Sequence, residues 1–239
     1  MDDRGTWIVT PDVEHYFETR EDAALAAANS IATALRRRLE HDQATSLVVT
    51  GGSSPQDCYA ALATAELPWS RVHIVLSDER WVPASNDDSN EKMIRSTLLI
   101  ENAAMAQLHP FYVEDADVQE RSSTFADELR GVPSPHASCL LGMGDDGHIA
   151  SLFADADNFS EGVDANNSQL CIPIKTAASP HARISLTLSA LLRSDEIVLL
   201  FFGESKRDVY KRAKLEADTY PVSRLLHQDR VPVSVFWAP

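Results

Sequence analysis

Short apolar runs alternate with helical segments along this chain, and no other feature limits its fold so strongly. The runs lie at residues 46–50, 72–76, 138–141, 184–188, 197–202 and 233–236. Helical patterns lie before the first run, at 19–40, and between later runs, in a stretch ending at Leu62, at 89–100 and at about 115–130. Buried strands that alternate with helices are typical of a parallel sheet covered on both faces. We therefore expect one α/β domain over residues 1–239, with a mostly parallel sheet and helices on both faces.

The first helical segment, residues 19–40, shows the pattern most clearly. Its apolar residues recur at steps of three and four, at Leu25, Ala28, Ala32, Leu35 and Leu39. Thr19 and Asp22 have the spacing of a capping box, with Asp in place of the usual Glu. The basic triplet at 36–38 would fall near the end of this helix, where cations suit the helix dipole. We interpret that triplet as a helix end rather than as a nucleic-acid site.

Charge and composition argue against several classes of partner. The chain has 21 Lys and Arg against 36 Asp and Glu, for a net charge of −15, and such a surface repels nucleic acid and anionic membranes. The longest apolar run, 197–202, is far shorter than the ~20 residues needed to cross a bilayer. The acidic start MDDRGTW does not resemble a signal peptide. Cys58, Cys139 and Cys171 lie far apart, as free thiols in a reducing cytoplasm would.

The chemistry of the chain is concentrated in the loops that follow the predicted strands. These loops read TGGSSP at 50–55, SDERWVP at 77–83, GMGDDGH at 142–148 and GESK at 203–206. In open α/β sheets, ligands bind beyond the carboxyl ends of the strands, where such loops meet. We therefore expect one site at that edge of the sheet.

An anion-binding site is one interpretation of TGGSSP. Glycines at 51 and 52 let the backbone approach a ligand, and the following helix start offers unpaired N–H groups. A plain tight turn would also use two glycines, so this alternative stays open. Arg80 offers a fork for a phosphate, and Lys206 lies at the start of a helix, where a cation opposes the dipole. A phosphate bound between Arg80 and Lys206 would explain both placements; a surface lysine and a solvated ion cluster are the alternatives.

The stretch at 142–147 is a literal G-x-G-x-x-G, the pattern of a dinucleotide-binding loop. Asp145 and Asp146 would put two negative charges against the pyrophosphate. The candidate ribose-binding acids, Glu161 and Asp164, lie in a polar stretch at 155–169 that we expect to be a surface loop. The match therefore does not indicate NAD, and no metal-type spacing of cysteines accompanies it.

His148 comes directly after this glycine-rich loop, with a carboxylate two residues earlier. Histidine titrates nearest to neutral pH and suits proton transfer. A lone histidine is more often structural, but this one shares an edge with the predicted anion site. We predict that it is a general base.

These motifs, in this order, resemble the family of 6-phosphogluconolactonases. The resemblance rests on TGGSSP, on DERWVP followed by Ser89-Asn90, on GMGDDGHIASLF at 142–153, on Arg183 before a strand and on GESK. It implies the fold of glucosamine-6-phosphate deaminase and ribose-5-phosphate isomerase. It also implies hydrolysis of 6-phospho-D-glucono-1,5-lactone to 6-phosphogluconate, the second step of the oxidative pentose phosphate pathway, without metal or organic cofactor. Ala154, where the family usually has proline, and the ending VFWAP depart from the pattern.

The resemblance further implies roles for individual residues. Catalysis is expected from His148 and Asp146, and substrate binding from Gly51, Gly52, Ser53, Ser54, Asp78, Arg80, Gly144, Arg183 and Lys206. Backbone N–H groups of the glycine-rich loop would stabilise the oxyanion. Either Asp146 or Asp78 would orient His148, and the sequence leaves both open. The expected partner is a phosphorylated sugar lactone, and the protein would be a monomer or a homodimer.

Two other functions must be weighed. The deaminases resemble this chain in D-G-H, but their pattern G-H-I-A-F-N-E-P places a glutamate five residues after the histidine. Phe153 stands at that position here, which favours the lactonase. Sugar-phosphate sensor domains share the fold without catalysis, but they normally carry a DNA-binding module, which the charge of −15 opposes.

Overall fold

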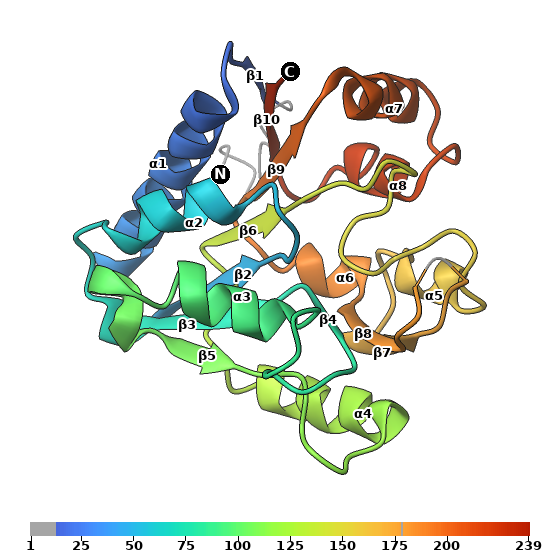
Figure 1. Ribbon diagram of the computed structural model, residues 1–239, viewed down its shortest axis with the longest axis horizontal. Coiled ribbons are helices and arrows are strands. Elements are labelled where there is room, and N and C mark those ends of the chain that lie inside the picture. Colours follow the sequence, from blue (N-terminus) through green and yellow to red (C-terminus); the bar gives the residue numbers. More distant parts are fainter. Residues whose placement is uncertain (1–12, 178) are drawn as a thin grey trace, which may run out of the picture.

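The computed structural model describes residues 13–177 and 179–239, and its centre is a seven-stranded sheet in which every pairing is parallel (Figure 1). The strand order is β1-β10-β9-β6-β2-β3-β5. The strands are β1 (Val13–Tyr16), β2 (Thr45–Val49), β3 (Val72–Leu76), β5 (Gln107–His109), β6 (Ser138–Leu141), β9 (Ile197–Phe202) and β10 (Val233–Ala238). The predicted parallel sheet is confirmed, and the runs at 72–76, 138–141 and 197–202 have the predicted bounds.

A second, smaller sheet lies beside the first and was not predicted. It is antiparallel, in the order β4 (Asp78–Arg80), β8 (Arg183–Leu186) and β7 (Cys171–Ile174). Two expectations were therefore wrong in part. The motif at 77–83 begins with a strand instead of being all loop, and the run at 184–188 belongs to this sheet. The cause is a change of partner at Ser77, whose N–H still bonds Val49 of β2 while its carbonyl already accepts from Leu186 of β8.

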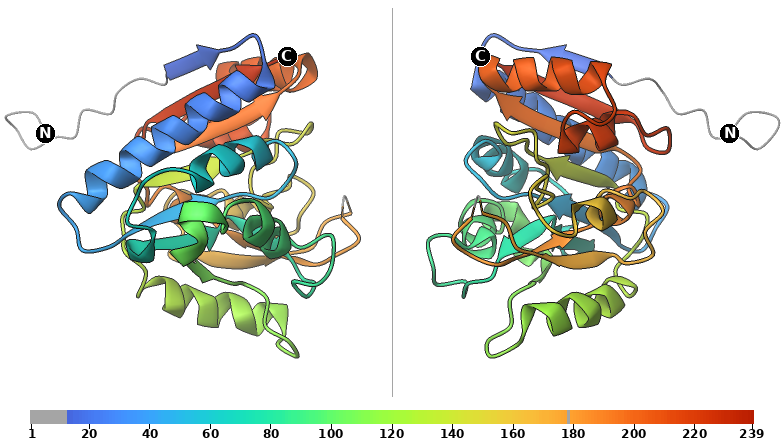
Figure 2. Two further views of the ribbon diagram at one scale, coloured as in Figure 1. Left: turned by 60° about the vertical axis from the view of Figure 1, so that its left-hand side comes forward. Right: turned by 90° about the vertical axis from the view of Figure 1, so that its right-hand side faces the viewer.

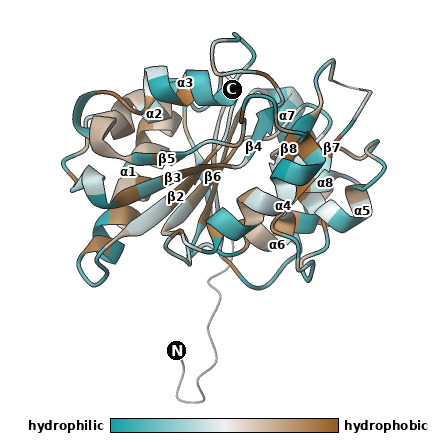
Figure 3. Ribbon diagram, turned by 90° about the horizontal axis from the view of Figure 1, so that it is seen from below, coloured by the Kyte–Doolittle hydropathy of each residue, from teal (hydrophilic) through white to brown (hydrophobic). Residues whose placement is uncertain are grey.

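Helices cover both faces of the seven-stranded sheet, as predicted. The α-helices are α1 (Arg20–Leu39), α2 (Gln56–Ala63), α3 (Asn90–Thr97), α4 (Val118–Leu129), α5 (Phe159–Gly162), α6 (Leu188–Leu191), α7 (Glu204–Leu215) and α8 (Pro221–Leu226). Two 3₁₀ turns, η1 (Trp69–Arg71) and η2 (Glu101–Met105), complete the set. Figures 2 and 3 show α1 and α2 on one face and α7 and α8 on the other. None of the helices described could span a membrane.

Helix α1 forms for the reasons given by its sequence. The Thr19 side chain caps it by accepting from the Asp22 N–H at 3.1 Å, and most of its alanines, together with Ile31 and Leu35, are buried. Arg38 in the last turn donates to Asp195 at 2.6 Å. One detail differs from expectation, because Leu25 is half exposed and does not belong to the buried face.

The elements missed by pattern are short or half exposed. The edge strands β1 and β5 read VEHY and QLH, and neither is a continuous apolar run. Short α5 lies within 155–169, where only a loop was expected. One cluster of buried apolar side chains joins the two sheets, containing Leu47 and Ile74 of the large sheet together with Ile172 and Ile184 of the small one.

Candidate active site

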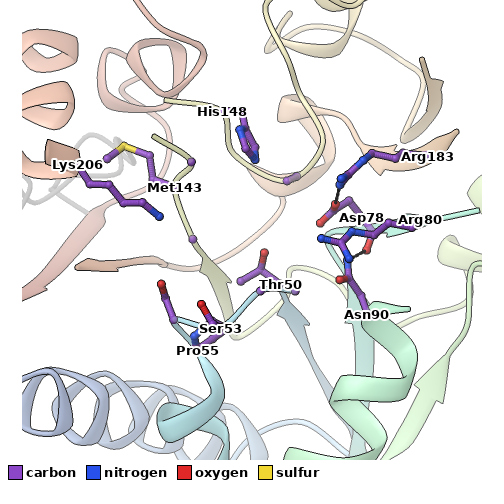
Figure 4. Close-up of a pocket in the computed structure, with 16 residues that line it drawn as sticks. Thr50, Ser53, Pro55, Asp78, Arg80, Asn90, Met143, His148, Arg183 and Lys206 are labelled. Atoms are coloured by element: carbon purple, nitrogen blue, oxygen red, sulfur yellow. Dashed lines mark hydrogen bonds and ion pairs between the residues drawn. The ribbon is translucent and has the colours of Figure 1, made fainter. Parts of the chain in front are cut away.

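A cavity of about 240 Å³ opens at the carboxyl edge of the large sheet, next to the small sheet (Figure 4). Its lining residues are Thr50, Gly51, Gly52, Ser53, Ser54, Pro55, Asp78, Arg80, Asn90, Gly142, Met143, Gly144, His148, Ala150, Arg183 and Lys206. The structure thus brings together every substrate-binding residue expected from the sequence, and His148 with them. Asp146 does not line the cavity, but its carboxylate contacts the Nδ1 of His148.

The TGGSSP loop forms the floor of the cavity, at the start of α2. The hydroxyl of Tyr59 holds it in place by accepting from the Thr50 N–H and donating to the Thr50 carbonyl, at 2.9 and 2.7 Å. A Cβ on Gly51 would lie 1.9 Å from the Asn90 Oδ1, so any other residue there would displace the Asn90 amide. Gly52 has a φ of +93°, which also favours glycine. The loop therefore presents its backbone to the cavity at a helix start, which suits an anion.

The GMGDDGH loop is shaped around its histidine. The Gly144 N–H donates to the His148 carbonyl at 2.9 Å, and the Gly147 N–H donates to the Gly144 carbonyl at 3.1 Å. A Cβ on Gly144 would lie 2.2 Å from two ring atoms of His148. The second glycine of the G-x-G-x-x-G pattern thus makes room for an imidazole.

Two side chains position the His148 ring. Its Nδ1 lies 2.5 Å from the Asp146 Oδ1, and this hydrogen bond lowers the pKa of Asp146. The ring of Phe153 packs on the imidazole with centroids 4.1 Å apart. The imidazole is about a quarter exposed, and in Figure 4 it points into the cavity. Because Nδ1 is engaged, Nε2 is the nitrogen that faces a ligand.

Asp78 makes different contacts. Its buried carboxylate accepts from the hydroxyls of Ser77 and Ser151 at 2.8 and 2.6 Å, and it lies 3.7 Å from the guanidinium of Arg183. Arg183 also donates to Ser151 at 3.2 Å, and its guanidinium lies 5.2 Å from the centre of the Phe153 ring. Of the two carboxylates considered from sequence, Asp146 contacts the histidine and Asp78 holds Arg183.

Arg80 and Lys206 point into the cavity from opposite sides, above the TGGSSP loop (Figure 4). Arg80 donates through one terminal nitrogen to the Asp88 carbonyl at 2.6 Å. Its Nε is buried and has no hydrogen-bond partner among the residues described. Lys206 lies in the first turn of α7, as the sequence predicted. Unpaired donors and cations around a helix start suit a phosphate group.

Asn90 is a cavity residue to which sequence reasoning assigned no role. Its side-chain amide donates to the Asp78 carbonyl at 2.9 Å and packs against Gly51. The only signal for it was Ser89-Asn90 after the DERWVP motif. Within residues 13–177 and 179–239, no three His, Cys, Asp or Glu side chains are grouped so that they could hold a metal ion.

Comparison with known proteins gives consistent matches. A family model described as glucosamine-6-phosphate isomerases/6-phosphogluconolactonase matches residues 18–237. The chain is 37% identical to a 6-phosphogluconolactonase of Caulobacter vibrioides, over 96% of this chain and 98% of the relative, and 34% identical to one of Mesorhizobium japonicum, over 93% and 94%. A crystal structure of a 6-phosphogluconolactonase from Shewanella baltica superposes with a TM-score of 0.91 at 32% identity, covering 98% of this chain and 100% of that one.

Proposed function

Because the chain belongs to the family of glucosamine-6-phosphate isomerases and 6-phosphogluconolactonases, we propose that it hydrolyses 6-phospho-D-glucono-1,5-lactone to 6-phospho-D-gluconate. The observation that carries the proposal is the cavity itself. At one end His148 is held by Asp146, and at the other the TGGSSP loop lies between Arg80 and Lys206. A base and an anion site in one cavity fit a phosphorylated ester.

The 6-phosphate binds at the TGGSSP loop. Backbone N–H groups and the hydroxyls of Ser53 and Ser54 surround it, and Arg80 and Lys206 supply positive charge from both sides. Arg80 lines this part of the cavity, and its guanidinium is held there by the hydrogen bond to the Asp88 carbonyl. Holding the far end of the sugar places its lactone carbonyl near His148, which supplies orientation rather than bond breaking.

The neutral imidazole of His148 then takes a proton from water through Nε2, and the water oxygen attacks C1 of the lactone. Asp146 holds Nδ1 and stabilises the imidazolium that forms. The C1–O bond of the ring breaks, and the imidazolium returns its proton to the departing ring oxygen. The products are a carboxylic acid at C1, which releases its proton to solvent and becomes the carboxylate, and a hydroxyl at the former ring oxygen.

The oxyanion at C1 needs a donor, for which backbone N–H groups of the glycine-rich loop were expected. The Gly144 N–H already donates to the His148 carbonyl, and that of Gly147 to the Gly144 carbonyl. We therefore assign the oxyanion to Arg183, which contacts the same Phe153 ring as His148. Gly144 contributes by leaving space for the imidazole of His148, which a Cβ at this position would occupy.

We further propose that the protein acts in the cytoplasm, in the second step of the oxidative pentose phosphate pathway, as a monomer or homodimer. The three cysteines support a reducing compartment, since all are free and buried. Burial raises the pKa of the Cys58 thiol to about 12, which makes it unreactive at neutral pH.

The test of function is a coupled assay with freshly generated 6-phosphogluconolactone, with spontaneous hydrolysis subtracted. We expect the purified protein to accelerate hydrolysis and to release no ammonia from glucosamine 6-phosphate above the blank. Ammonia release would favour the deaminase, which Phe153 argues against, because an apolar ring packs on His148 where the deaminase pattern has an acid. Binding of 6-phosphogluconate without turnover of the lactone would favour a sensor domain.

A further inference from the structure

Glu79 is fully buried, although its neighbours Asp78 and Arg80 both line the cavity. Its carboxylate accepts four hydrogen bonds. Oε1 accepts from the backbone N–H of Arg80 at 2.7 Å and of Asn90 at 2.8 Å. Oε2 accepts from the Glu91 N–H at 2.7 Å and from the Ser89 hydroxyl at 3.1 Å. One side chain therefore ties β4 to the start of α3.

These contacts go beyond the capping of a helix. The first N–H groups of a helix lack partners within it, and a carboxylate suits its positive end. Ser89 already caps α3 by accepting from the Lys92 N–H at 3.2 Å. Glu79 adds a bond to Arg80, which is on the strand, so its carboxylate sets the position of β4 relative to the helix.

The two residues bound by Oε1 both face the cavity. The guanidinium of Arg80 lies in the cavity lining, and the side chain of Asn90 packs against the TGGSSP loop. The Asn90 amide donates to the Asp78 carbonyl at 2.9 Å, and its Oδ1 occupies the space that a Cβ on Gly51 would need. A continuous series of contacts thus runs from Glu79 through Asn90 to Gly51, with Arg80 attached at the same carboxylate oxygen.

We propose that Glu79 is a positioning residue for phosphate binding. It fixes the guanidinium of Arg80 and, through Asn90, the TGGSSP loop, so that the two lie at the distance from each other that a bound phosphate needs. This inference rests on the proposed function in one respect, that Arg80 and the loop bind the 6-phosphate. Glu79 itself does not line the cavity. It acts by preorganisation, because a binding group displaced by about 1 Å loses much of its effect.

Glu79→Gln tests the proposal with almost no change of shape. The amide keeps one accepting oxygen but turns an NH₂ toward two of the four donors, so one side of the contact must open. We expect KM for the lactone to rise about 10- to 100-fold, the effect of losing a charge-assisted hydrogen bond, while kcat stays nearly unchanged. In calorimetric titrations, affinity for 6-phosphogluconate should fall by a similar factor, and affinity for gluconate should not change.

Glu91→Gln is the matched control. Glu91 lies in the same turn of α3, but its side chain pairs with Arg95 at 2.8 Å and does not contact the Glu79 carboxylate. This variant should keep the wild-type KM and the preference for phosphorylated ligand. A lower melting temperature of Glu79→Gln with unchanged KM and unchanged phosphate preference would show a merely structural role and would overturn the proposal.

If Glu79→Gln does not fold, Glu79→Asp is the second variant that tests the proposal. It keeps the charge but is one methylene shorter, so it reaches only one of the two elements, and we expect KM to rise and phosphate preference to shrink. An unchanged preference would contradict the proposal. The binding titrations separate this inference from the proposed function, since they need no turnover. Wild-type protein that does not prefer 6-phosphogluconate over gluconate would refute both, whereas a preference retained in the folded variants would refute only the role of Glu79.

Discussion

The two walls of the cavity are built in different ways. The His148 wall consists of neighbours in sequence, because Gly144, Asp146 and Phe153 all contact a histidine that lies within five residues of them. The opposite wall is held by contacts between distant segments. Asp78, for example, accepts from Ser151, which lies 73 residues away. The two walls therefore have different functions. A local loop carries the histidine that transfers a proton, and a wall held together by hydrogen bonds between distant segments carries the groups that bind the ligand.

Each wall is also supported by a carboxylate that does not line the cavity, Asp146 on one side and Glu79 on the other, and the pKa values of these two move in opposite directions. Asp146 is more than half exposed, and its hydrogen bond to His148 lowers its pKa. Glu79 is fully buried, and burial raises its pKa to about 7 although backbone N–H donors act against that rise. Asp146 thus favours charge on its partner at little cost, whereas the charge of Glu79 is costly and must be satisfied by fixed donors.

The largest effect is expected on the local wall. His148→Ala should lower kcat by about 10²–10⁴, the usual contribution of a positioned general base. Binding of 6-phosphogluconate, measured by calorimetry, should survive because the opposite wall is untouched. His41→Ala, at an exposed histidine after α1, is the control and should behave as wild type. Loss of binding together with kcat would show that the two walls do not act separately.

The cost of the buried carboxylate should be visible in the pH dependence of stability. A carboxyl group whose pKa is raised from 4.5 to about 7 by folding stabilises the fold fully below pH 4.5 and loses this contribution as pH rises through about 7. The loss is on the order of 3 kcal/mol. Urea unfolding at several pH values should show this decline in wild type and not in Glu79→Gln. Parallel pH profiles of the two proteins would contradict the assignment.

The cations should affect binding more than turnover. Arg80→Ala and Lys206→Ala should each weaken binding of 6-phosphogluconate by roughly 1.5–3 kcal/mol, the range of charge-assisted hydrogen bonds. Arg80 should be at the upper end, because its guanidinium is already fixed by the Asp88 carbonyl. Lys211→Ala, on the same helix as Lys206 but paired with Asp208, is the control. An unchanged preference for 6-phosphogluconate over gluconate would place the phosphate elsewhere.

The two aspartates should differ in their effect on KM. Asp146→Asn should lower kcat by roughly 10- to 100-fold, less than the ~10⁴ of a buried triad aspartate, because solvent screens an exposed carboxylate. Asp78→Asn should raise KM as well as lower kcat, because Asp78 holds Arg183, which lines the cavity and to which the oxyanion is assigned. Steady-state kinetics of the two variants decide the matter. The reverse pattern would mean that Asp78 orients the histidine.

The smallest effect is a shift in the pH profile. Phe153→Glu would place a carboxylate against the imidazole, favour its protonated form and leave less neutral base. The acidic limb of the kcat/KM profile should move up by roughly one pH unit. Phe153→Leu, which adds no charge, should leave the limb in place. The glutamate variant should not become a deaminase, since that reaction needs several groups placed to within about half an ångström. An unmoved limb would contradict the observed ring contact.

Much of this protein was predictable from sequence wherever the determining contacts are local. The Thr19 cap, the strand at 72–76 and the glycine-rich loop that carries His148 all depend on residues a few positions apart. The choice of Asp146 over Asp78 as the partner of His148 was left open by the sequence. Parallel strands also bring the loops after β2, β6 and β9 to one edge of the sheet, and a single site at that edge was predicted for this reason.

Tertiary structure decided what depends on the path of the chain between distant segments. The small sheet, the burial of Glu79 and the contact of Asn90 with Gly51 arise because the chain leaves the large sheet at Ser77 and pairs with β8, more than 100 residues later. In sequence, Asp78, Glu79 and Arg80 look alike as three adjacent charges. Strand alternation and the packing of α3 bury Glu79 fully and leave Asp78 and Arg80 in the lining of the cavity. The pattern of charges in the sequence does not indicate which of the three residues is turned away from the cavity.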